Sequence, residues 1–232
     1  MMDSPKTTAI TVYPDEGWVN RVGGLAAFAI GIAYVVIIAL YASVGVPPEG
    51  GQARLDYLAG KTTAWWAIVG VSVLTNFLYV PVALSLYFAL RGVNRFAMLL
   101  AIAFMGLFVI LENAVNWTSY GALILLSKGY ASAASEGQRA VFVAAATYVS
   151  AVLESPLAGV WAIATLSFAV LVIGIVMLKG VFSKLTAYVG IVTGIFGIAG
   201  VAGIGKAIIL NALATTVWLF LVGCRLWRLA VY

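Results

Sequence analysis

The chain has 232 residues, of which 64% are apolar and 9% are charged, and its net charge is +5. A soluble domain is about 45–50% apolar and about 25% charged, so this composition excludes a water-soluble globule and indicates an integral membrane protein. There is no histidine and one cysteine, Cys224, which excludes an internal disulfide and any metal or haem site built on those ligands. The basic residues lie at the ends of apolar runs, which argues against nucleic-acid binding.

Six apolar runs are long enough to cross a bilayer, which takes about 20 helical residues. They follow a polar N-terminal segment, 1–20, and no soluble domain fits between them. Because lipid cannot satisfy exposed backbone groups, each run is expected to be a helix. The sequence therefore predicts an all-α, polytopic helix bundle that forms a single membrane domain over 1–232. The six expected transmembrane helices are about 22–44, 64–90, 95–126, 139–178 (interrupted at Pro156), 185–203 and 206–229.

Basic residues in the flanks of these runs predict the orientation of the chain. With the N-terminus in the cytoplasm, eight lysines and arginines fall on the inner side and five on the outer side. The short inner connectors RGVNR, at 91–95, and KGVFSK, at 179–184, each carry two basic residues and no acid. We therefore expect both termini to be cytoplasmic, in a multi-pass protein of the cell (inner) membrane.

Two carboxylates, Glu112 and Glu154, lie inside apolar runs. Acids buried in a bilayer are costly and usually face the bundle interior or a wet cavity. At about 1.5 Å per helical residue, these acids and the buried amides, which together come from four runs, fall in the outer half of the membrane or at its outer edge. This common level predicts one polar cavity that opens toward the outside. The expected ligand-binding residues are Asn76, Glu112, Asn113, Asn116, Trp117, Tyr148, Glu154 and Asn211.

The leading functional hypothesis is a non-catalytic or transport-like protein that binds a small or lipid-like ligand. A cationic ligand suits two acids near Trp117 and Tyr148. The alternative is a membrane-embedded acid–base enzyme, an isomerase or cyclase acting on a lipid, with Glu112 and Glu154 as the catalytic candidates. No nucleophile motif supports catalysis, and no metal or cofactor is expected. Each candidate residue also has a structural alternative, as a packing amide, a paired acid or an interfacial aromatic.

The fifth run is rich in glycine at spacings of three and four residues, which allows helices to approach closely. Packing within the chain is the leading expectation for this face, Gly190–Gly203. The alternatives are a homo-oligomer or another membrane protein, for which this chain would be an accessory subunit. Membrane lipids are the other expected partners. The glycines are Gly190, Gly194, Gly197, Gly200 and Gly203.

Four stretches resemble a family of six-helix prokaryotic integral membrane proteins that is catalogued as a domain of unknown function. They are LRGVNRFA at 90–97, LENAVN at 111–116, SEGQRAVFVAAA at 135–146 and LKGVFSKLTAYVGIVTGIFG at 178–197. The resemblance runs over about 20–228 and is one of hydropathy, small residues and loops. It implies the six-helix fold and carries over no functional residue.

Overall fold

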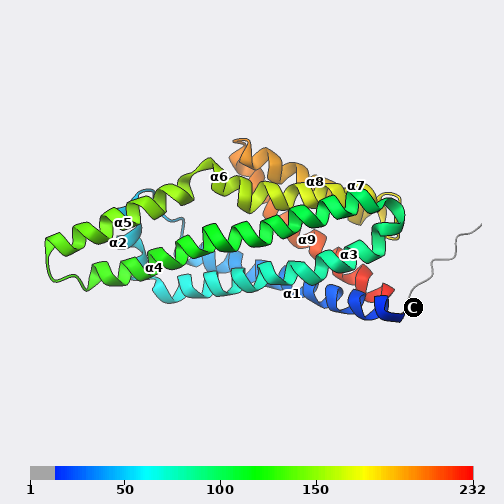
Figure 1. Cartoon of the computed structure of the whole chain (residues 1–232), viewed down its shortest axis with the longest axis horizontal. Helices are drawn as coiled ribbons and strands as arrows, with labels where there is room; N and C mark the ends of the chain where they lie inside the picture. The colour runs from blue at the N-terminus through cyan, green and yellow to red at the C-terminus, as the bar shows by residue number, and fades with distance from the viewer. Residues whose placement is uncertain (1–13, 232) are drawn as a thin grey trace, which may run out of the picture.

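The computed structural model describes residues 14–231, and every element in that range is helical (Figure 1). The predicted all-α class is therefore confirmed. Residues 1–13, most of the predicted polar segment 1–20, lie outside the described residues. The helices are α1 (Pro14–Val44), α2 (Gly51–Ala59), α3 (Thr62–Leu111), the π-helical turn η1 (Glu112–Trp117), α4 (Thr118–Ala131), α5 (Glu136–Glu154), α6 (Pro156–Gly159), the π-helical turn η2 (Val160–Ala164), α7 (Thr165–Met177), α8 (Lys184–Val201) and α9 (Gly205–Leu229).

Five helical stretches within the described residues are long and apolar enough to cross a membrane. They assign the chain to the multi-pass membrane proteins, as its composition predicts. The predicted spans 64–90 and 95–126 both fall within one of these stretches, which is 70 residues long. The five stretches are Gly17–Val44, Thr62–Ala131, Pro156–Met177, Lys184–Val201 and Gly205–Leu229.

The 70-residue stretch folds back on itself at Asn94, where Figure 1 shows the helix reversing direction. Asn94 has non-helical backbone angles, φ −155° and ψ 93°, and its side-chain oxygen accepts a hydrogen bond from the backbone N–H three residues later, at 3.0 Å. This is the geometry of a helix N-cap. The two arms are antiparallel, because the ring of Tyr79 meets that of Phe108 at 5.5 Å and the amide of Asn76 donates to Asn113 at 3.1 Å.

The predicted segment 139–178 is not one span, and this expectation is corrected. Helix α5 ends at Glu154, and Ser155 is extended, with φ −62° and ψ 137°. A new helix begins at Pro156, and the Ser155 hydroxyl accepts the N–H of Leu157 at 3.3 Å. Proline disfavours the helical conformation in the residue before it and suits the first position of a helix. Pro156 therefore separates two helices, and only Pro156–Met177 qualifies as a span.

Two hydrophobic cores are stacked along the molecule. The first lies among α1, α3, α7, α8 and α9, and includes Leu86, Ile173 and Trp218. The second includes Leu55 and Leu123 and lies where α2, α4 and α5 pack together at one end of the molecule, on the left in Figure 1. We call α2, α4 and α5 the cap. The helices around the first core form the bundle, which contains the site described below.

The glycines of α8 pack against α7 and α9 of the same chain. A Cβ atom added to Gly194 would lie 2.7 Å from the Ser167 carbonyl oxygen, and one added to Gly190 would lie 2.7 Å from Nε1 of Trp218. Both distances are shorter than real Cβ contacts, so the three helices approach as closely as they do because side chains are missing here. Gly203 differs, since it ends the helix with φ +104° and faces open space.

Candidate ligand-binding cavity

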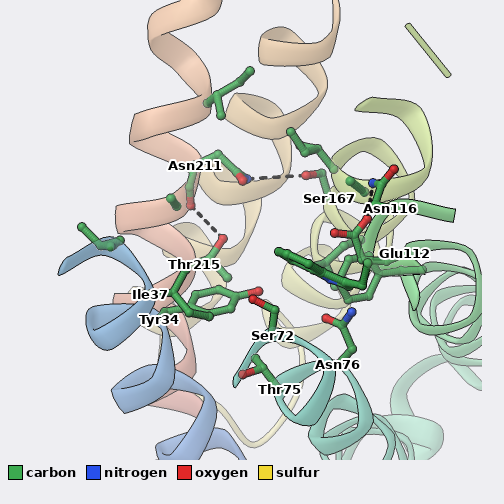
Figure 2. Close-up of a pocket in the computed structure, with 18 of the residues that line it drawn as sticks. Tyr34, Ile37, Ser72, Thr75, Asn76, Glu112, Asn116, Ser167, Asn211 and Thr215 are labelled. Carbon is green, nitrogen blue, oxygen red and sulfur yellow. Dashed lines mark hydrogen bonds between the residues drawn. The ribbon is translucent and has the colours of Figure 1, made fainter. Parts of the chain in front are cut away.

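A cavity of about 430 Å³ lies inside the bundle. Figure 2 shows polar side chains from several helices pointing into it, among them Tyr34 from α1, Asn76 from α3, Glu112 from η1, Ser167 from α7 and Asn211 from α9. Small-molecule sites in proteins have volumes of about 300–1,000 Å³ and combine an apolar wall with a few convergent polar groups. The cavity has both the size and the composition of such a site.

Glu112 and Asn116 form a buried pair in the cavity wall. Asn116 Nδ2 donates to Glu112 Oε2 at 2.5 Å and also to the carbonyl oxygen of Ala158, on α6, at 3.5 Å. The pair lies on η1, where the N–H of Thr118 bonds to the carbonyl of Asn113, five residues earlier. Such wide turns are rare within α-helices and are frequent at functional sites.

The charges in the lining are of one sign. Glu112 is the only carboxylate among the described residues that line the cavity, and no lysine or arginine is among them. The rings of Tyr41, Trp117 and Tyr120 belong to the same lining. Ring faces attract cations, and an ionisable side chain inside a membrane bundle usually serves function. The wall therefore suits a ligand with a positively charged group.

Four buried polar atoms in the lining have no hydrogen-bond partner. Buried polar groups are nearly always paired, and one left unpaired costs about 1–3 kcal/mol. The four atoms are two hydroxyl groups, an amide oxygen that accepts and an indole N–H that donates, so the residues around the cavity offer both kinds of hydrogen-bonding group. They are Ser72 Oγ, Asn116 Oδ1, Trp117 Nε1 and Thr193 Oγ1.

Asn211 fixes the opposite wall of the cavity (Figure 2). The side-chain Nδ2 of Asn211 donates to the Thr193 carbonyl oxygen at 2.8 Å and to Ser167 Oγ at 3.5 Å. The Thr215 hydroxyl donates to the backbone carbonyl oxygen of Asn211 at 2.7 Å. Asn211 thereby joins α9 to α7 and α8. This is the structural role expected of a buried amide between helices, and it is performed at the edge of the cavity.

An aromatic cluster lies between the cavity and the core of the cap. The ring of Trp65, which belongs to the cap core, stacks on that of Tyr120 at 4.9 Å and contacts that of Tyr41 edge-on at 5.6 Å. Trp117 lies against Tyr120 at 5.7 Å. Three of these four rings line the cavity, so the cluster forms its roof.

Five of the eight residues predicted to bind a ligand line the cavity and three do not. Asn113 is engaged by Asn76, as described above. Tyr148 is 75% exposed on α5. Glu154 is held in the cap, where Arg54 lies 3.3 Å from its Oε1 and the N–H of Gly50 donates to it at 2.8 Å. The five lining residues are Asn76, Glu112, Asn116, Trp117 and Asn211.

Sequence reasoning missed Tyr34 and the hydroxyl residues of the lining. The hydroxyl oxygens of Tyr34 and Tyr79 lie 2.8 Å apart, which holds the Tyr34 ring at the cavity. Serine and threonine are common in membrane helices, where they bond to their own backbone, as Thr75 does to the Val71 carbonyl at 2.7 Å. Their gathering on the inner faces of four helices was the available signal. The missed hydroxyl residues are Ser72, Thr75, Ser167, Thr193 and Thr215.

Comparison with protein-family models, with curated protein sequences and with solved structures gives no match. Over the residues that the structure describes, the fold and the cavity define an all-helical, multi-pass membrane protein with a largely apolar cavity that a few polar side chains enter.

Proposed function

We propose that the protein crosses the inner membrane six times and binds a small or lipid-like cationic ligand in the cavity. The sixth span results from counting the two arms of Thr62–Ala131 separately, since they run in opposite directions from Asn94. Six spans place both termini on one side. This agrees with the antiparallel contact of α1 and α9, in which a Cβ on Gly17 would lie 3.7 Å from the Ala230 carbonyl oxygen. The basic connectors favour the cytoplasm for that side.

The observation that carries this proposal is the buried Glu112–Asn116 pair, which faces a cavity that holds no positively charged side chain among its described lining residues. A carboxylate in a membrane bundle is stabilised by a cation or by protonation. Asn116 Oδ1, in the same pair, is an acceptor without a partner, and the aromatic rings of the lining can supply cation–π contacts. An ammonium group only donates hydrogen bonds, so the carboxylate, this amide oxygen and the ring faces are the groups of the lining that can bind it.

The enzyme alternative has weaker support. Acid–base catalysis by two carboxylates needs both of them at the reacting group. Glu154 contacts Arg54 and the N–H of Gly50 in the cap and is not among the residues that line the cavity. Glu112 alone could accept or donate a proton. The described lining residues include no second acid that could complete the catalytic pair.

Headgroup preference tests the proposal. The purified protein, in nanodiscs of zwitterionic lipid, is titrated with dodecylamine, dodecanol and dodecanoate, which share one chain length and differ in charge. We expect thermal stabilisation by the amine, and a loss of affinity of about tenfold in Glu112→Gln, which corresponds to about 1.4 kcal/mol. The matched control is Glu49→Gln, since Glu49 is exposed and lies outside the cavity. Equal responses to all three headgroups, or an unchanged response in Glu112→Gln, would contradict the proposal.

A further inference from the structure

The exposed part of the cavity lining lies on two helices. Ile38 on α1 is 42% exposed and Ile208 on α9 is 39% exposed, whereas the other described lining residues are buried or half-buried. Both isoleucines belong to stretches that are long and apolar enough to cross a membrane. An exposed isoleucine within such a stretch faces hydrocarbon, so the open side of the cavity faces lipid.

Helices α1 and α9 are in close contact on the cytoplasmic side of this opening. A Cβ on Gly24 would lie 3.2 Å from the Gly223 carbonyl oxygen, and one on Gly31 would lie 3.0 Å from the Phe220 ring. Farther along, near Ile38 and Ile208, side chains of both helices line the cavity. The two helices thus close the wall in one half of the membrane, and the cavity lies between them in the other half.

Toward both ends of the bundle, the described residues that line the cavity are buried or half-buried. Toward the cap lies the aromatic roof, in which Trp65 is fully buried behind Tyr120 and Tyr41. Toward the cytoplasmic end lies the bundle core, in which Tyr79 and Leu219 are fully buried. A ligand therefore reaches Glu112 most directly through the gap between α1 and α9.

Building on the proposed function, we propose that the ligand is a single-chain cationic amphiphile taken from the bilayer. Its amine binds at Glu112, and its hydrocarbon chain leaves the cavity between Ile38 and Ile208. A chain that remains in lipid loses no hydrophobic stabilisation on binding, so only the headgroup has to move from the membrane surface into the cavity. The polar atoms of the cavity and the apolar rim of the gap match the two parts of such a molecule.

A photoreactive probe tests where the chain lies. The probe is a long-chain primary amine with a diazirine near the end of its chain, added to the protein in nanodiscs, irradiated, and mapped by mass spectrometry. We expect adducts on α1 and α9 around Ile38 and Ile208, removed by excess dodecylamine and reduced about tenfold in Glu112→Gln. Adducts confined to the interior, for example on Ser167 or Thr193, and still dependent on Glu112 would overturn the lipid-facing route and leave the binding function standing.

The absence of any adduct that depends on Glu112 would overturn both the route and the proposed function. A matched pair of variants gives a second test. Ile208→Trp places an indole at the gap, whereas Ile209→Trp places one on the neighbouring residue, which is 65% exposed and does not line the cavity. We expect Ile208→Trp to reduce the labelling yield severalfold and Ile209→Trp to leave it unchanged, with both variants eluting as folded protein. Equal yields in the two variants would contradict the route.

Discussion

Arg54 and Glu154 form an ion pair that ties α2 to the end of α5, with 3.3 Å between the guanidinium and the carboxylate. The same carboxylate oxygen accepts the N–H of Gly50 at 2.8 Å. Arg54 is buried and also donates to the carbonyl oxygens of Pro48 at 2.9 Å and Ser150 at 3.3 Å. One arginine therefore fixes the connector after α1, the helix α2 and the last turn of α5, beside the point where the chain breaks at Ser155.

Glu154→Gln should lower the free energy of unfolding by about 1–2 kcal/mol. The substitution leaves a buried guanidinium without its counter-charge, and the loss falls below that of a fully buried pair because the Glu154 side chain is 34% exposed. Thermal unfolding in detergent, with Glu49→Gln as the control, measures the difference. If the two variants unfold at the same temperature, the ion pair does not stabilise the cap.

Glu112→Gln should preserve stability better than Glu112→Ala. An amide oxygen at this position can still accept the hydrogen bond from Asn116 Nδ2, whereas alanine leaves that buried donor with only its 3.5 Å contact to the Ala158 carbonyl oxygen, at a cost of about 1–3 kcal/mol. The unfolding temperatures of the two purified variants decide the matter. Equal losses would indicate that the charge of Glu112, and not its hydrogen bond, contributes to stability.

Gly194→Ala should destabilise the protein, although the change is one methyl group. The new Cβ would lie 2.7 Å from the Ser167 carbonyl oxygen and 2.9 Å from Cα of Leu171, so α8 must move away from α7. Overpacking of this kind costs about 1–3 kcal/mol, and Gly194→Leu should cost more. The control is Gly106→Ala, whose Cβ meets nothing within 4 Å and which should be neutral or stabilising. A stable Gly194→Ala would mean that the two helices separate easily.

Cysteine labelling in intact cells tests the orientation, in a Cys224→Ser background. Glu49→Cys, in the exposed connector after α1, should react with an impermeant maleimide. Val93→Cys, beside the reversal at Asn94, should react after permeabilisation only. The reverse pattern would place the cap and the outer end of the cavity in the cytoplasm.

Hydropathy predicted the membrane class and the reversal at 91–95, and five of the eight candidate residues that it selected by depth line the cavity, because these features depend on run length, charge and depth. The depth of a residue along a helix does not show in which direction its side chain points around the helix axis. Glu154 and Tyr148 lie on a helix of the cap and outside the cavity lining, since the residue before Pro156 is extended and ends that helix. The π-helical turns η1 and η2 have no sequence pattern that distinguishes them from α-helix. Only the structure therefore shows that Glu112 and Asn116, on η1, both face the cavity.

The two cores meet at one ring contact. The end of the cap where α4 is followed by α5 carries exposed charges at Lys128, Glu136 and Arg139, and water favours the burial of apolar side chains there. Between membrane-spanning helices lipid gives no such driving force, and close packing and interhelical hydrogen bonds hold the helices together. Because Trp65 in the cap core stacks on Tyr120 in the cavity roof, a loss of packing in the cap would remove one support of that roof.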